Sequence, residues 1–122
     1  MKKYVYLGML FSMIVPVVPA FANIVCTGTV TYLGEDAGGA VAIGLNSKDT
    51  NGSLQNGVKI CNTNADRSGV TASACKEWYA TLLASKISGQ TVGIYFGGSP
   101  ICSSVTPWDD TVIGQVYFIA TL

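Results

Sequence analysis

The chain of 122 residues contains no histidine, and only 11% of its residues are charged. The absence of histidine excludes Ser–His–Asp and Cys–His catalysis and every metal site that requires imidazole. Seven basic and seven acidic side chains give a formal net charge of zero, and no strongly basic stretch is present. This balance argues against binding to nucleic acid, which needs a surface that neutralises phosphates. The length accommodates one domain rather than two.

Long apolar runs are also scarce, and the one that is present lies at the N-terminus. Residues 1–3 form a short positive start, residues 4–19 are almost wholly apolar, and residues 20–22 fit the small-x-small cleavage pattern of a signal peptide. The apolar run is about 16 residues long, whereas roughly 20 are needed to span a bilayer. We therefore predict a signal peptide over residues 1–22 and one exported domain over residues 23–122. The expected location is the periplasm or the medium of a bacterium, without stable membrane insertion.

Four cysteines follow the predicted signal peptide, an even number in a small exported chain where disulfides can form. Their spacing contains no CxxC, so the sequence indicates no zinc site, no redox motif and no cofactor. Four cysteines allow three pairings. We favour Cys61–Cys75, which closes a short polar loop before a helix, together with Cys26–Cys102, which ties the first strand to the segment after the fourth.

Alternation of apolar residues and the spacing of turn signals predict five strands and one helix. The strands are expected over residues 24–33, 40–45, 58–61, 90–96 and 111–122. The last strand is apolar on both faces, which is typical of a central strand or of one covered by a neighbouring subunit. The resulting order, β-β-β-α-β-β, is that of the five-stranded OB-fold barrel, and a two-layer α+β sheet is the alternative.

The helix is expected between a cap at Thr71 or Ser73 and a left-handed residue at Gly89. One apolar stripe recurs at helical spacing and is expected to face the core: Cys75, Trp78, Tyr79, Leu82, Leu83 and Ile87. Ala80 and Ala84 form a small-residue seam on another side. High helix propensity explains the seam, and close packing of helices in an oligomer is the alternative.

Two pairs of adjacent acidic residues fall in expected loops, Glu35 with Asp36 and Asp109 with Asp110. A glycosidase needs two carboxyl groups that face each other across the scissile bond, one of them in an apolar setting. Adjacent acids in exposed turns do not have this arrangement. The sequence therefore predicts no catalytic residues, no metal ligands and no enzymatic activity.

Trp108, which precedes the second acidic pair, is the most informative single residue. An indole stacks on the apolar face of a sugar while carboxylates accept hydrogen bonds from its hydroxyl groups. The alternative is that Trp108 plugs one end of the barrel beside Cys102. OB-folds bind ligands with a strand face and two flanking loops, here residues 34–39 and 97–110. The candidate ligand-binding residues are therefore Trp108, Asp109, Asp110, Glu35 and Asp36.

Residues 61–96 combine several features in a fixed order. A cysteine ends a strand, a polar loop leads to a second cysteine, Cys75, and an aromatic helix with Trp78 stops at Gly89 before the next strand. This pattern resembles the B subunits of pertussis-like and subtilase-type bacterial toxins, and also small uncharacterised exported proteins of gammaproteobacteria. The resemblance implies an OB-fold, the Cys61–Cys75 bridge and a homo-pentamer that binds host sialoglycans and carries a catalytic A chain.

The chain also departs from those toxin subunits in two ways. Their glycan-contacting serine lies in a segment before the first cysteine-bearing region, and this chain enters its first strand almost directly after the expected cleavage site. They usually hold a late pair of cysteines, whereas Cys102 here must reach back to Cys26. We therefore expect an exported, non-catalytic binding module for a glycan or a protein surface. The alternative is a small periplasmic structural or inhibitory protein without affinity for glycans.

Overall fold

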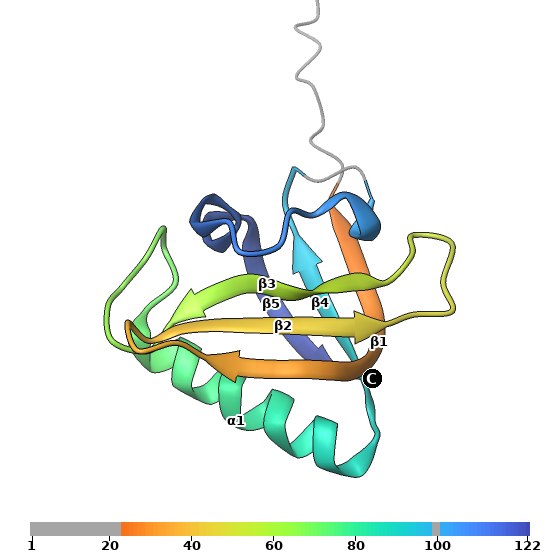
Figure 1. Ribbon diagram of the computed structural model, residues 1–122, viewed down its shortest axis with the longest axis horizontal. Helices are drawn as coiled ribbons and strands as arrows, with labels where there is room; N and C mark the ends of the chain where they lie inside the picture. The colour runs from red at the N-terminus through yellow and green to blue at the C-terminus, as the bar shows by residue number, and fades with distance from the viewer. Residues whose placement is uncertain (1–22, 99–100) are drawn as a thin grey trace, which may run out of the picture.

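The computed structural model describes residues 23–98 and 101–122, so the predicted signal peptide lies outside the described residues. The elements are β1 (Ile24–Glu35), β2 (Ala40–Asn46), β3 (Leu54–Asn62), α1 (Ala72–Ser88), β4 (Thr91–Phe96), the 3₁₀ helices η1 (Cys102–Ser104) and η2 (Asp110–Gln115), and β5 (Val116–Thr121). All five strands form one antiparallel sheet in the order β3-β2-β1-β4-β5 (Figure 1). The predicted mainly-β class and the helix between the third and fourth strands are confirmed. No ladder joins β3 to β5 within the described part of the chain, so closure into a barrel is not confirmed.

β1 connects the two halves of the sheet because its first half pairs with β4 and its second half with β2. A register shift interrupts the second ladder, in which Val30 lies opposite Leu45 and Tyr32 lies opposite Gly44. Thr31 is thus an extra residue, and an extra residue reverses the face on which every later side chain lies. Val30 and Leu33 pack in the core as a result, whereas Tyr32 lies on the outer face.

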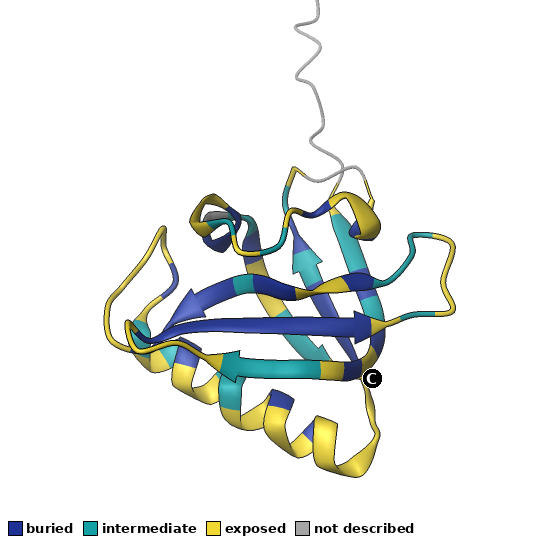
Figure 2. Cartoon of the chain, viewed as in Figure 1, coloured by how far each residue is buried: buried dark blue, intermediate teal, exposed yellow. Residues whose placement is uncertain are grey.

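β2 is buried along almost its whole length, as Figure 2 shows. Its core face carries large apolar side chains, each at most 1% exposed: Val41, Ile43 and Leu45. Before its last residue, Asn46, its outer face carries small residues: Ala40, Ala42 and Gly44. These small residues make a flat floor over which larger side chains from neighbouring segments can lie.

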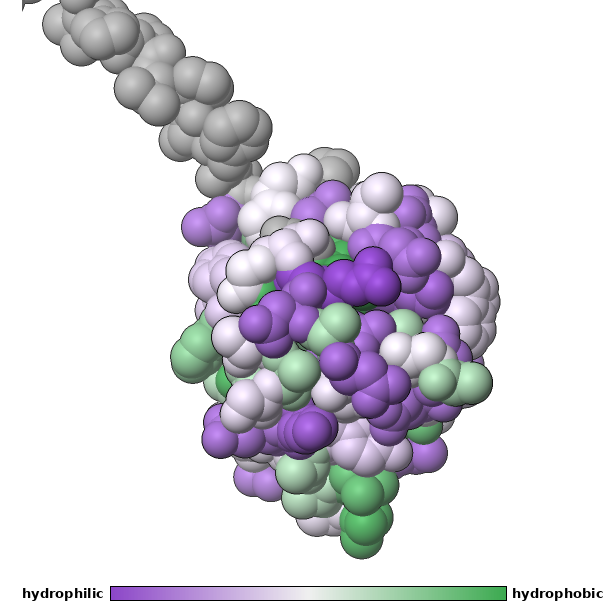
Figure 3. Space-filling model, turned by 90° about the vertical axis from the view of Figure 1, so that its left-hand side faces the viewer, coloured by the Kyte–Doolittle hydropathy of each residue, from purple (hydrophilic) through white to green (hydrophobic). Residues whose placement is uncertain are grey.

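The predicted core stripe of α1 is wrong at two positions. Leu83 and Ile87 are 40% and 80% exposed, whereas Leu82 and Ser85 are buried. A helix turns by about 100° per residue, so the buried face that runs from Cys75 to Ser85 leaves Leu83 and Ile87 to one side. Figure 3 shows hydrophobic atoms gathered at the lower end of the molecule, where α1 lies, beneath a mostly polar face.

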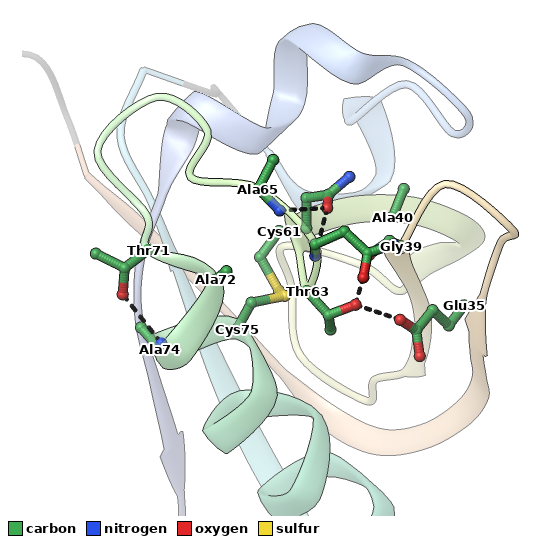
Figure 4. Close-up of a disulfide and its surroundings, with 12 residues drawn as sticks. Glu35, Gly39, Ala40, Cys61, Thr63, Ala65, Thr71, Ala72, Ala74 and Cys75 are labelled. Carbon is green, nitrogen blue, oxygen red and sulfur yellow. Dashed lines mark hydrogen bonds between the residues drawn. A yellow bond between two sulfur atoms is a disulfide. The ribbon is translucent and has the colours of Figure 1, made fainter.

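The two ends of α1 follow the sequence prediction. The Thr71 hydroxyl accepts a hydrogen bond of 3.0 Å from the Ala74 N–H (Figure 4). Gly89 ends the helix with a φ of 71°. A Thr at the N-cap satisfies one of the backbone donors that the first turn leaves unpaired. A left-handed residue at the C-terminus favours glycine, because glycine has no Cβ to clash there.

Two disulfides join the pairs favoured above. Cys61–Cys75 ties the end of β3 to the first turn of α1, and Cys26–Cys102 ties β1 to η1. Disulfides form and persist in oxidising compartments, so the bonds indicate an extracellular or periplasmic environment. Within residues 23–98 and 101–122, no helix is long and apolar enough to cross a membrane.

The C-terminal segment differs from the expected strand over residues 111–122. Its first part forms η2, because the Asp109 carboxylate accepts a hydrogen bond from the Thr111 N–H and so starts a helical turn. β5 begins only at Val116 and lies at an edge of the sheet, so the first of the two alternatives, a central strand, is wrong, and a strand covered by a neighbouring subunit stays a prediction. Tyr117 and Phe118 on this edge strand are each 52% exposed.

Candidate functional site

A small open pocket of about 130 Å³ lies where the β1–β2 turn and the segment before η2 meet over the outer face of β2. The floor is formed by Ala40 and Ala42, and the walls carry all the larger side chains: Tyr32, Glu35, Asp36, Lys59 and Trp108. The structure thus brings together three of the five candidate residues, Glu35, Asp36 and Trp108, from segments more than 70 residues apart in the chain.

Trp108 has an unusual backbone conformation. It follows Pro107 in a turn and has a φ of 59°, although bulky residues rarely adopt positive φ. Such a conformation costs about 1–3 kcal/mol and persists only when the surrounding structure enforces it. Part of that enforcement is a hydrogen bond of 2.8 Å from the Trp108 N–H to the Gly57 carbonyl oxygen.

The indole of Trp108 is held on one side and open on the other. It lies so close to the backbone of Gly57 that a Cβ at this position would overlap the ring, and the Tyr32 ring meets it edge-on at 6.0 Å between centroids. Trp108 is nevertheless 59% exposed. The alternative that Trp108 plugs one end of a barrel is therefore wrong.

The first acidic pair is fixed by hydrogen bonds from its own neighbourhood. Asp36 Oδ1 accepts hydrogen bonds from the N–H groups of Gly38 and Ala40 at 2.8 and 3.0 Å, and so shapes the β1–β2 turn. The Glu35 carboxylate accepts a hydrogen bond from the Thr63 hydroxyl, as Figure 4 shows. Both acids line the pocket, but each has a structural partner already.

The two residues of the second acidic pair, Asp109 and Asp110, have different partners. Asp109 accepts hydrogen bonds from the Thr111 N–H at 2.9 Å and the Thr111 hydroxyl at 2.8 Å. These bonds, in that order, and to a smaller extent the charge of Lys59, lower the pKa of Asp109. Asp110 instead forms an ion pair of 2.7 Å with Lys59, whose side chain is only 16% exposed. Asp109 does not line the pocket, and Asp110 reaches it through Lys59.

Sequence reasoning missed Tyr32, Lys59 and Gly57. Tyr32 would face the core by simple alternation, and only the extra residue at Thr31 turns it outward. The alternation of small and large residues along β2 was the available signal, because a face of small residues leaves room for larger side chains from elsewhere to pack over it.

Two larger hollows of the described residues lack this combination of groups. One, of about 370 Å³, is lined by polar residues such as Thr27, Asn46 and Asp49 and by no aromatic ring. The other, of about 330 Å³ between α1 and β5, contains Trp78 and Tyr117 but no acidic side chain. The Trp108 pocket combines exposed aromatic surface with hydrogen-bond acceptors.

Comparison with known protein families, curated proteins and solved structures finds no match for this chain. Among the residues that the structure describes, no group of three or more His, Cys, Asp or Glu side chains is placed to hold a metal ion. The chemistry of the pocket must therefore be read from its own side chains. An exposed aromatic face beside carboxylates can stack on an apolar surface and accept hydrogen bonds from hydroxyl groups.

Proposed function

We propose that this protein is a non-catalytic glycan-binding module whose sugar ligand stacks on Trp108. The observation that carries the proposal is an indole that is 59% exposed to solvent and yet held by a strained backbone, the Gly57 carbonyl and the edge of Tyr32. A strained, exposed residue that the surroundings enforce is a hallmark of binding sites. Because the ring is already ordered, a ligand would lose less of its binding free energy to ordering the site.

The neighbouring groups suit a sugar better than a purely apolar ligand. Sugars present C–H groups on one face, which pack against an indole, and hydroxyl groups around the ring edge. Carboxylates are strong acceptors for hydroxyl donors, and Glu35, Asp36 and Asp110 lie in or beside the pocket. Tyr32 offers a second ring and a hydroxyl group.

The fold and the location enter the proposal as well. We propose that this sheet, in the order β3-β2-β1-β4-β5, is an OB-fold barrel left open between β3 and β5. The pocket is lined in part by the β1–β2 turn and by the segment before η2, the two loops that OB-folds use for ligands, and this supports the proposal. The resemblance of residues 61–96 to toxin B subunits is part of the same proposal. We further propose that residues 1–22 are removed on export, which the mass of the mature protein tests.

Self-association is part of the proposal. The exposed apolar residues Leu83 and Ile87 on α1, with Tyr117 and Phe118 on β5, are surfaces of the kind that subunits cover in oligomers. Light scattering after size exclusion measures the mass of the oxidised protein. A species of about five subunits would favour a ring like that of the toxin B subunits. A monomer would contradict the proposed self-association, and the sugar site would then be tested separately.

The sugar site is tested by titrating soluble oligosaccharides that an array has selected, with binding followed by NMR so that avidity does not contribute. Replacement of Trp108 by Ala should weaken binding at least tenfold, a loss of about 1.4 kcal/mol. The control is Ile101→Ala, which removes another exposed large apolar side chain from the same long loop but away from the pocket and should leave binding unchanged. If no oligosaccharide binds the folded protein, the proposal fails, and a structural or inhibitory role becomes the better account.

A further inference from the structure

We propose that the Trp108 pocket takes a glycan whose stacked sugar carries no acidic group. This inference rests on the proposed function and names the class of sugar that the site accepts. Glycans with a carboxylated or sulfated sugar, such as sialoglycans, are expected to be rejected. The observation behind it is the balance of charge and of hydrogen-bond donors around the pocket.

Among the described residues, the pocket and its rim carry three carboxylates and one basic side chain. Glu35 and Asp36 line the pocket, and Asp110 lies beside it through its ion pair with Lys59. Lys59 lines the pocket, and its Nζ lies 2.7 Å from Asp110 Oδ1. An anionic sugar on Trp108 would therefore meet a net negative field.

The ammonium group of Lys59 is not available to a second anion at low cost. Its side chain is 16% exposed, whereas the Asp110 side chain is 70% exposed. A ligand carboxylate would have to displace Asp110, and so leave that acid without its partner beside the new anion. Replacing one partner of a close ion pair with another of the same charge gives no net electrostatic gain.

The donors that hold the two lining acids are also occupied. The Thr63 hydroxyl donates to Glu35, and the N–H groups of Gly38 and Ala40 donate to Asp36. What these acids present to the pocket is therefore acceptor oxygen. Hydroxyl groups can donate to such oxygens, but ionised carboxylate and sulfate groups are acceptors and cannot.

The experiment uses the oxidised, signal-cleaved protein and an array on which each neutral oligosaccharide is printed beside the same glycan with a terminal sialic acid or sulfate. For the neutral glycans that bind, the acidic counterpart should bind at least about tenfold more weakly at 10 mM salt, where the Debye length is about 30 Å. The difference should shrink in 0.5 M salt, because the repulsion is then screened. Soluble pairs titrated by calorimetry give the same ratio without avidity.

A variant pair then assigns the discrimination to the pocket. The double replacement Glu35→Gln and Asp36→Asn keeps the acceptor oxygens that hold Thr63 and the β1–β2 turn but removes two charges. In this double variant, the affinities for the neutral glycan and for its acidic counterpart should differ by less than about threefold. Glu77→Gln, which removes an exposed charge from α1, should leave the ratio as in the unmodified protein.

The outcomes separate the two proposals. Equal or tighter binding of the acidic glycan, lost in both Trp108→Ala and Lys59→Gln, would overturn this inference but support the proposed function, with Lys59 as the anchor of the acid. If neutral glycans bind Trp108→Ala as tightly as the unmodified protein, both proposals are overturned. Absence of binding to every printed glycan would also overturn both.

Discussion

The two faces of β2 carry side chains of very different size. On one face, the side chains of Val41, Ile43 and Leu45 fill the core. On the other face, Ala40, Ala42 and Gly44 have little or no side chain. Both faces are buried, but by different means. The core face is covered by the rest of the sheet and by α1, whereas the outer face is covered by Tyr32, Lys59 and Trp108.

This comparison separates stability from recognition within one strand. Large apolar side chains on the core face contribute most to the free energy of unfolding, because they remove the largest apolar area from water. Small residues on the outer face contribute little area, but they leave room over the strand for Tyr32 and Trp108. If this division is correct, changes on the two faces should have separable effects.

The largest expected effect is on the core face. Ile43→Ala should lower the free energy of unfolding by about 2–5 kcal/mol, because Ile43 is 0% exposed and its removal leaves a cavity. Urea denaturation measures the loss. The dissociation constant of a bound oligosaccharide, measured on the folded variant, should not change. A change in affinity comparable to that of Trp108→Ala would show that the two faces are not independent.

Enlarging a small residue on the outer face should affect both the free energy of unfolding and the affinity for the sugar. Ala42→Leu places a larger side chain on the floor under Tyr32 and Trp108, and overpacking of this kind costs about 1–3 kcal/mol. Sugar binding should be lost because the rings must move. Ala65→Leu, at an exposed loop position, is the control and should change stability by less than about 0.5 kcal/mol. Retention of sugar binding in Ala42→Leu would contradict the role of the floor.

A smaller effect is expected at Gly57, where two causes can be separated. Gly57→Ala imposes a side chain on a φ of 99° and also pushes against the indole, whereas Gly69→Ala imposes one on a φ of 86° with nothing within 4 Å. Positive φ costs a non-glycine residue about 1–2 kcal/mol. In urea denaturation, Gly57→Ala should therefore lower the free energy of unfolding by more than Gly69→Ala does. Of the two variants, Gly57→Ala alone should weaken sugar binding. Equal effects of the two variants would exclude the contact between Gly57 and the ring as a determinant.

The smallest expected effect is a pH dependence at Asp109. Its pKa is lowered below 3.8 in the folded protein by the hydrogen bonds from Thr111 and by Lys59. A depressed pKa means that the ionised form stabilises the fold above pH 3.8 and that this contribution disappears as the pH falls through the folded pKa. Denaturation between pH 6 and pH 2 measures the free energy of unfolding of the unmodified protein and of Asp109→Asn. The difference between these two free energies should decrease with falling pH. A difference that grows instead would contradict the assigned direction.

Local patterns in the sequence predicted much of the fold. The caps at Thr71 and Gly89, the helix after the third strand and the two cysteine pairs follow from residue types and spacing. The burial of Leu83 and Ile87 was predicted wrongly, because a run of apolar residues allows more than one buried stripe. The start of β5 was also missed, because the turn set by Asp109 competes with strand propensity over residues 110–115.

The candidate site was predicted only in its loops. Trp108, Glu35 and Asp36 were found because exposed aromatic and acidic residues in turns stand out in a sequence. Tyr32 could not be found by alternation, because the extra residue at Thr31 reverses the face of the strand. Lys59 requires knowledge of the register between β2 and β3, which places it opposite Ala42. Long-range register is set by tertiary packing rather than by local sequence.

The most direct measurement of the central claim uses the fluorescence of Trp108. The chain has two tryptophans, so Trp78→Phe leaves Trp108 as the only indole. Titration of this variant with a neutral oligosaccharide from the array should give a saturable change in the Trp108 emission, with the same dissociation constant as the change seen by NMR. An emission spectrum that stays constant while the oligosaccharide binds would place the sugar elsewhere and contradict the account.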